Sequence, residues 1–140
     1  MTGLEQLQAM LADGNAQPAI GRTLDFRLVE VAKGRAVFEG NPDARTYNPL
    51  GTVHGGYAAT LLDSACGIAT YASLTEGQTY TTLELKVAYH RAMTADTGPV
   101  RAEGTVISIG RRVAFAEARL TDTAGRLLAS ATSTLLVITL

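Results

Sequence analysis

The sequence predicts one α+β domain, in which an antiparallel sheet of five to six strands wraps a long central helix. Residues 55–74 carry a single charge, Asp63, and place apolar or small side chains on every face, which is typical of a helix inside a protein. Alternating segments on both sides of this helix are joined by short turns, and such turns favour antiparallel pairing over a βαβ arrangement. A long apolar helix and a long antiparallel sheet can cover each other only if the sheet curls around the helix.

The composition fits a single domain, residues 1–140, and argues against several classes of function. A net charge of −1 gives no basis for binding nucleic acid or for a polybasic membrane contact. The central helix is richer in Ala and Gly than in Leu, Ile and Val and contains Ser and Thr, which argues against a membrane span. With one Cys and two His we expect neither a disulfide nor a bound metal. The N-terminus lacks the basic and apolar blocks of a signal peptide, so we expect a cytoplasmic protein.

Before the central helix we expect a helix, a loop, two strands and an irregular segment, in that order: residues 3–12, 18–23, 24–31 and 35–39, and 41–50. In the first helix three leucines recur at helical intervals, and Asp13-Gly14-Asn15 ends it. The two strands alternate, and Lys33-Gly34 between them is a hairpin turn signal.

After the central helix we expect four strands: residues 80–91, 100–109, 113–121 and 127–138. The first alternates, with one face formed by Leu83, Leu85, Val87 and Tyr89 and the other by Glu84, Lys86 and His90. Strict alternation places Thr82 on the Glu84 face. A curled sheet still has edges, so we expect the chain to pair with a second copy of itself.

A motif at the start of the central helix resembles a known family. The string Asn48-(x)2-Gly51-(x)2-His54-Gly55-Gly56-(x)6-Asp63, in this order of elements, resembles the hotdog-fold acyl-CoA thioesterases, most closely the phenylacetic-acid-degradation (PaaI-like) type. The resemblance covers roughly residues 25–137, and residues 82–89 are similar to the strand that follows the helix in that family. His90-Arg91-Ala92 departs from it, because the family often has an aliphatic residue and then Arg-Pro or Ser-Pro.

The resemblance implies a catalytic role for five residues. Asn48 and the backbone N–H of Gly55 would hold the thioester carbonyl, and His54 would orient that end of the site. Asp63 would act as general base on water or as nucleophile, and Thr82 would help to place the water. Coenzyme A would be part of the substrate, with no retained cofactor. The resemblance also implies a homodimer, or a dimer of dimers.

The chemistry of these residue types suits thioester hydrolysis. Gly55 and Gly56 are expected to begin the helix, where free N–H groups and the positive end of the helix dipole can stabilise an oxyanion. Asp63 can supply a base. It lies eight residues after Gly55, about 12 Å along a helix that rises ~1.5 Å per residue. One carbonyl cannot touch both groups of one chain, so a shared site needs two chains with antiparallel helices.

Several alternatives stay open at this point. Asp63 can be a hydrogen-bonded structural acid, His54 can cap the helix, and Thr81 can replace Thr82. For substrate binding we select the glycine at the helix start, the residues of a predicted hairpin tip and one further arginine: Gly56, Gly110, Arg111, Arg112 and Arg91. The tip arginines can meet the phosphates of coenzyme A or form a solvated turn. The functional hypothesis is an acyl-CoA thioesterase for aromatic or medium-chain acyl groups; the alternative is a non-catalytic acyl-CoA binder.

Overall fold

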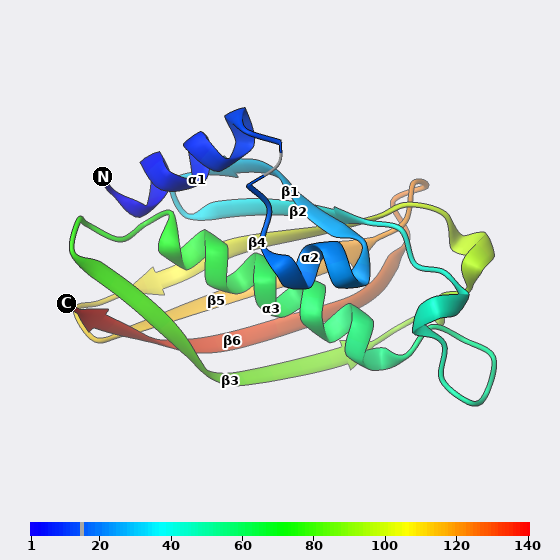
Figure 1. Ribbon diagram of the computed structural model, residues 1–140. Coiled ribbons are helices and arrows are strands. Elements are labelled where there is room, and N and C mark those ends of the chain that lie inside the picture. The colour runs from blue at the N-terminus through cyan, green and yellow to red at the C-terminus, as the bar shows by residue number, and fades with distance from the viewer. Residues whose placement is uncertain (15) are drawn as a thin grey trace.

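The computed structural model of the protein describes residues 1–14 and 16–140 (Figure 1). The helices are α1 (Gly3–Ala12), α2 (Ala19–Leu24) and α3 (Gly55–Tyr71), with short 3-10 turns at Ala44–Thr46 and Ala95–Thr97. The strands are β1 (Phe26–Ala32), β2 (Arg35–Gly40), β3 (Gln78–Tyr89), β4 (Val100–Ile109), β5 (Val113–Thr121) and β6 (Leu127–Thr139). None of the described helices is long and apolar enough to cross a membrane.

The six strands form one antiparallel sheet in the order β1-β2-β4-β5-β6-β3. The sheet curls around α3, which packs against all six strands (Figure 1). This arrangement confirms the predicted α+β class and the predicted central helix. β3 follows α3 directly in the chain but lies at the edge of the sheet, beyond β6.

Small residues let α3 approach the sheet closely. Leu61, Leu62 and Cys66 of α3 are fully buried between the helix and the sheet. Burial raises the pKa of the Cys66 thiol to about 12. At Gly104 of β4 a Cβ atom would lie 2.2 Å from the backbone oxygen of Ala65, so only glycine fits there. The core therefore depends on direct contact between the backbones of helix and strand.

Two predictions for the N-terminal region were wrong, the loop at 18–23 and the start of the first strand at residue 24. Residues 18–23, expected as a loop, contain α2, and Leu24 belongs to this helix, not to a strand. Asp25 adopts a left-handed conformation with φ of 60° that ends α2, so β1 begins at Phe26. The helix α1 is confirmed and begins with a capping box between Thr2 and Glu5. Of the residues expected to end it, Asn15 lies outside the described residues.

A bulge in β3 corrects the predicted face of Thr82. The pairing of β3 with β6 shifts register between Thr82 and Glu84, so Leu83 is an extra residue. Thr82 lies opposite the buried Leu135, whereas Glu84 lies opposite Thr134. Thr82 therefore faces α3, and strict alternation, which grouped it with Glu84, was wrong.

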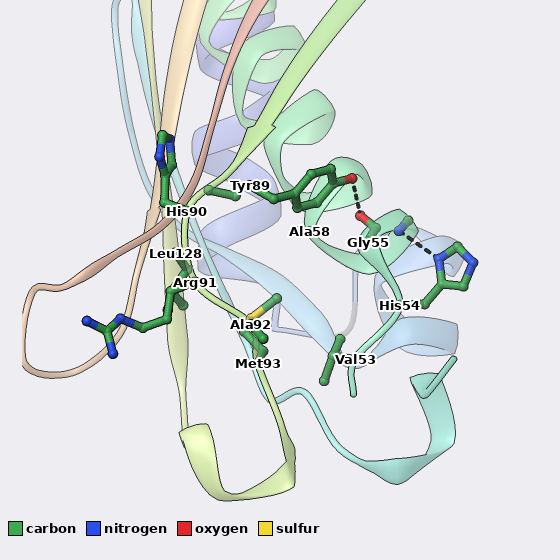
Figure 2. A pocket seen from close by; sticks show the side chains of 12 residues that line it. Val53, His54, Gly55, Ala58, Tyr89, His90, Arg91, Ala92, Met93 and Leu128 are labelled. Atoms are coloured by element: carbon green, nitrogen blue, oxygen red, sulfur yellow. Dashed lines mark hydrogen bonds between the residues drawn. The ribbon is translucent and has the colours of Figure 1, made fainter. Parts of the chain in front are cut away.

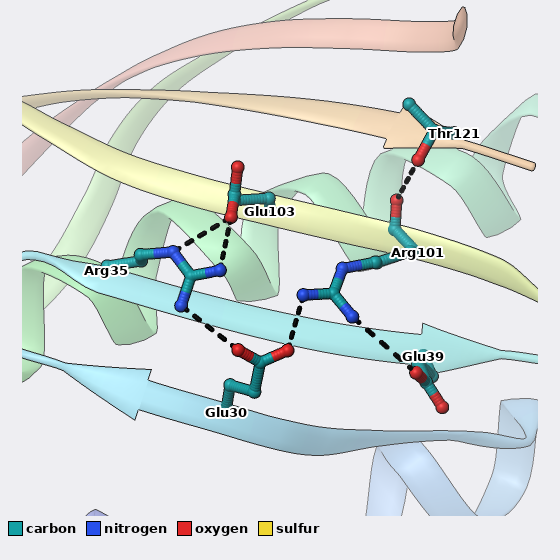
Figure 3. Close-up of polar contacts among 6 residues, drawn as sticks. All are labelled: Glu30, Arg35, Glu39, Arg101, Glu103 and Thr121. Atoms are coloured by element: carbon teal, nitrogen blue, oxygen red, sulfur yellow. Dashed lines mark hydrogen bonds and ion pairs between the residues drawn. The ribbon is translucent and has the colours of Figure 1, made fainter. Parts of the chain in front are cut away.

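The outer face of β1, β2 and β4 carries a ladder of alternating charges (Figure 3). Arg35 binds Glu103 through Nε at 2.8 Å and Glu30 through one terminal nitrogen at 3.3 Å. Arg101 hydrogen-bonds the other oxygen of Glu30 and lies 3.9 Å from Glu39. Both arginines hold the pKa of Glu30 below its usual range, Arg101 with the larger effect.

This ladder predicts a pH-dependent stability. A carboxylate whose pKa is lowered by folding stabilises the protein above its unfolded pKa, and loses this contribution as the pH falls through its folded pKa. We expect Glu30→Gln to lower the free energy of urea unfolding at neutral pH, and we expect the difference from wild type to disappear in acid. Glu117→Gln, on the outer face of β5 and outside the ladder, is the control. An equal deficit for Glu30→Gln at neutral and acidic pH would contradict this role.

Candidate active site

Helix α3 begins at Gly55 because His54 caps it. His54 has non-helical backbone angles (φ −58°, ψ 136°), and its Nδ1 accepts a hydrogen bond from the Gly56 N–H at 2.8 Å. Because Nδ1 accepts, the neutral ring carries its proton on Nε2. The sequence alternative that His54 caps the helix is therefore correct, and the cap leaves an Nε2–H donor on the exposed side of the ring.

The two glycines of the first turn differ in what they can offer a ligand. The Gly56 N–H is occupied by His54. For the Gly55 N–H we find no hydrogen-bond partner among the described residues. At the positive end of a helix of 17 residues, this amide can bind an oxyanion.

A cavity of about 500 Å³ opens beside this turn (Figure 2). Its walls are residues 53–56 and Ala58, the last residue of β3 with the four residues that follow it (89–93), and Leu128 and Ala129 of β6. Arg91, one of the predicted substrate-binding residues, lies on its rim with the side chain directed away from Gly55 (Figure 2).

Asn48 shapes the loop before the helix. Its Oδ1 accepts from the N–H groups of Leu50 and Thr52 at 2.9 and 3.2 Å, and its Nδ2 donates to the Thr52 hydroxyl at 2.9 Å. Asn48 is not among the residues that line the 500 Å³ cavity. One hydrogen of its amide group is left for a ligand.

Asp63 lies on α3, partly buried, where it meets Thr82 of β3. The Thr82 hydroxyl donates to Asp63 Oδ1 at 3.0 Å, whereas Thr81 is exposed. The structure thus brings Asp63 together with Thr82, and Oδ2 has no hydrogen-bond partner among the described residues. Asp63 lines a second cavity, of about 220 Å³, whose other walls come from α2 and the two residues before it, and from β1, β2, α3 and β3: Gln17, Pro18, Ile20, Gly21, Phe26, Phe38, Ser64, Ile68 and Tyr80.

Tyr80 is a further candidate site residue, which was not predicted from the sequence. Its ring lies on Gly67, one helical turn beyond Asp63, where a Cβ atom would be 2.4 Å from the tyrosine hydroxyl. Burial, and to a smaller extent the charge of Asp63, raises the pKa of Tyr80 to about 12. We find no hydrogen-bond partner for this hydroxyl among the described residues. An isolated glycine inside a buried helix is a known sign of close approach, and it was the available signal.

Tyr89, expected only as part of one face of β3, lies at the wall of the 500 Å³ cavity (Figure 2). Its hydroxyl donates to the Gly55 carbonyl oxygen at 2.7 Å. No motif indicated this contact, because it joins residues 34 positions apart in the chain.

The helix start and the acid are separate within one chain. Gly55 lines the first cavity and Asp63 the second, and the two linings share no residue. The remaining predicted residues, Gly110, Arg111 and Arg112, form the β4–β5 turn at the far end of the sheet from the first turn of α3 (Figure 1). Both arginines are exposed beside a groove against residues 136–139.

Within the described residues there is no group of three or more His, Cys, Asp or Glu side chains that could hold a metal ion. The groups present are a carboxylate with a hydroxyl donor at the second cavity, and a free backbone amide and an imidazole N–H at the first.

Comparison with known proteins identifies the family. Residues 50–129 match the Thioesterase superfamily. The proofreading thioesterase EntH of Klebsiella pneumoniae is 34% identical over 84 residues, which span 60% of each chain. The 1,4-dihydroxy-2-naphthoyl-CoA hydrolase of Listeria monocytogenes is 30% identical over 82% of this chain and 92% of its own. A solved putative thioesterase from Ralstonia eutropha, related to phenylacetic acid degradation, superposes with a TM-score of 0.82 at 27% identity, covering 92% of this chain and 97% of that one. The chain therefore belongs to the thioesterase superfamily and has its hotdog fold.

Proposed function

We propose that this protein is an acyl-CoA thioesterase. The observation that carries the proposal is Asp63, a carboxylate held by Thr82 on an otherwise uncharged, buried helix and facing a largely apolar cavity. A charge in such surroundings is costly, and its retention points to a chemical role. Relatives named as a proofreading thioesterase and as a CoA hydrolase support the same reaction class.

The complete site requires two chains, because Gly55 and Asp63 of one chain line different cavities. β3 contacts both the helix start and the acid: Tyr89 at its end binds Gly55, and Thr82 near its middle binds Asp63. β3 is also an edge strand, open to pairing. If two β3 strands pair antiparallel, residue 89 of one copy comes near the start of β3 in the other. Gly55 of each copy then lies toward Asp63 of the other, and a dimer has two composite sites.

In this site the Gly55 N–H and the His54 Nε2–H stabilise the negative charge that develops on the thioester oxygen. Asp63 Oδ2 removes a proton from water, which attacks the carbonyl carbon. The tetrahedral intermediate then releases the thiolate as the C–S bond breaks. If Asp63 attacks directly, a mixed anhydride forms and water hydrolyses it. Thr82 supports either course, because its bond to Oδ1 fixes the carboxylate.

The second cavity is the proposed place for the acyl group. Phe26 and Phe38 meet edge to face in its wall with ring centroids 5.7 Å apart, and Tyr80 forms a further aromatic wall. A volume of about 220 Å³ fits an aromatic or medium-chain acyl group. We place the phosphates of coenzyme A at Arg111 and Arg112, because in the antiparallel dimer this end of one chain adjoins the Gly55 end of the other.

Asp63→Asn tests the reaction. We expect the variant to fold and bind acyl-CoA but to lose on the order of 10²–10⁴ in kcat, the usual cost of removing a positioned base. Thr82→Val should lower kcat by a smaller factor. The measurement is thiol release from benzoyl-CoA, phenylacetyl-CoA and medium-chain acyl-CoAs, with Glu84→Gln on the outer face of β3 as the control. A wild-type protein that binds these thioesters without releasing thiol would be a binder and not an enzyme.

Salt tests the placement of coenzyme A. Phosphate contacts with exposed arginines weaken as ionic strength rises, since charges are screened over about 10 Å at 0.1 M. We expect KM to increase with salt in the wild type, and we expect the Arg111→Ala/Arg112→Ala variant to have a high KM at all salt concentrations. Arg27 lies on β1, the edge strand opposite β3, so Arg27→Ala should have the KM and the salt dependence of the wild type. If the double variant keeps the wild-type KM at low ionic strength, the two arginines form only a solvated turn.

Mixed dimers test the composite site. Asp63→Ala keeps the Gly55 amide, whereas Gly55→Pro removes it and keeps the acid. Proline is tolerated at the first helical position, and the backbone of His54 (φ −58°, ψ 136°) suits a residue before proline. The proline Cβ requires the Tyr89 side chain of the same chain to move, and this chain contributes only Asp63 to the intact hybrid site. Co-refolding the two inactive chains makes about half of the dimers hybrid, each with one intact site of two, so activity should return to roughly a quarter of wild type.

Circular dichroism and sedimentation establish that the proline variant is folded and dimeric. Verified hybrids that stay as inactive as their parents would exclude a site shared in this way.

A further inference from the structure

Tyr89 ties the end of β3 to the first turn of α3 (Figure 2). Its hydroxyl donates to the Gly55 carbonyl oxygen at 2.7 Å. A Cβ atom on residue 55 would lie 2.9 Å from this hydroxyl oxygen and 3.0 Å from the ring carbon that bears it. Gly55 is not one of the glycines with positive φ, so its backbone conformation does not require glycine. Glycine is required at this position because the Tyr89 side chain lies so close to it.

The peptide group between Gly55 and Gly56 makes two hydrogen bonds besides those of the helix itself. Its carbonyl accepts from Tyr89, and its N–H donates to His54 Nδ1 at 2.8 Å. Both bonds polarise the peptide in the same sense, because a proton donor at the oxygen makes the N–H a stronger donor. Tyr89 and His54 are therefore coupled through a single peptide plane.

This coupling determines which nitrogen of His54 carries the proton. While Nδ1 accepts from Gly56, the neutral ring keeps its proton on Nε2, the nitrogen that faces away from the helix. A weaker Gly56 donor, or a tilted peptide plane, would free the ring to rotate and to exchange tautomers.

We propose that Tyr89 is a positioning residue, which acts through the Gly55–Gly56 peptide to hold His54 in its Nε2–H tautomer and in a fixed orientation. The inference rests on the proposed function, in which this N–H and the Gly55 amide receive the thioester oxygen. Tyr89 itself touches neither the thioester nor Asp63 in this scheme.

Its environment favours this role over a purely structural one. In the single chain Tyr89 is 56% exposed, and it lies on the wall of the 500 Å³ cavity. A hydrogen bond made by an exposed hydroxyl adds little to stability, because water can replace it. What the hydroxyl does provide is a fixed direction for the Gly55–Gly56 peptide.

The test is the tautomer of His54, observed by long-range ¹H–¹⁵N NMR at a pH where the ring is neutral. The chain has only two histidines, His54 and His90, so His90→Gln assigns the spectrum. In the wild type we expect the Nε2–H form almost alone. In Tyr89→Phe, which keeps the ring on Gly55, the His54 signals should move toward the tautomer mixture of the urea-unfolded protein. In kinetics, kcat should fall about five- to tenfold with KM little changed.

Gly55→Ala gives an independent test, because it keeps the backbone amide while its Cβ displaces the Tyr89 hydroxyl. It should shift the His54 signals as Tyr89→Phe does, and the double variant should add no further shift. Tyr47→Phe is the matched control: its hydroxyl accepts from the Ala95 N–H at 2.7 Å and does not bond the Gly55–Gly56 peptide, so no shift is expected.

Unchanged His54 signals in both folded variants would overturn the proposal, whatever their activity. If the signals shift but the wild type releases no thiol from acyl-CoA, the positioning of His54 stands and the proposed function fails. The two inferences can therefore fail separately.

Discussion

The close contact between α3 and the sheet is the constraint on which the rest of the structure depends. At Gly104 the backbones of helix and strand touch, and at Gly67 the ring of Tyr80 rests on the helix. Such packing requires glycine where the backbones or the Tyr80 ring come closest. A carboxylate can remain there only with a dedicated donor, which Thr82 supplies. The site is thus a product of the packing, since the same approach that buries the helix places strand side chains beside Asp63.

Much of the fold was predictable because periodicity reports which faces are buried. The bounds of α1, β4 and β5 agree with the predicted ones, and the start of α3 at Gly55 follows from its glycines and the preceding histidine. α2 was not predictable in this way, since six residues without a side-chain cap leave almost no pattern. The bulge at Leu83 arises from pairing with β6, and one strand read alone does not contain that information.

The candidate site likewise contains residues that a local motif predicts and residues that depend on packing. A local motif identifies Asp63, Gly55 and His54, because spacing along one helix and its cap is written in consecutive residues. Tyr80 and Tyr89 join them only through the packing of β3 on α3, and the glycines at 67 and 55 were the visible traces of this contact. The direction of the Asn48 side chain, which serves the loop up to Thr52, likewise depends on local geometry that the motif does not specify.

One feature of β3 bears on how this chain can change in evolution. From a single strand, Thr82 reaches Asp63 and Tyr89 reaches Gly55, and Leu83 lies between them as an extra residue. Deleting one residue there would reverse the face of one of the two side chains while leaving the composition almost unaltered. We expect lineages of this protein to accept insertions and deletions in exposed turns, such as residues 122–126 between β5 and β6, and to keep the length of residues 82–89 constant. The count of residues in this strand is then inherited as strictly as their identity.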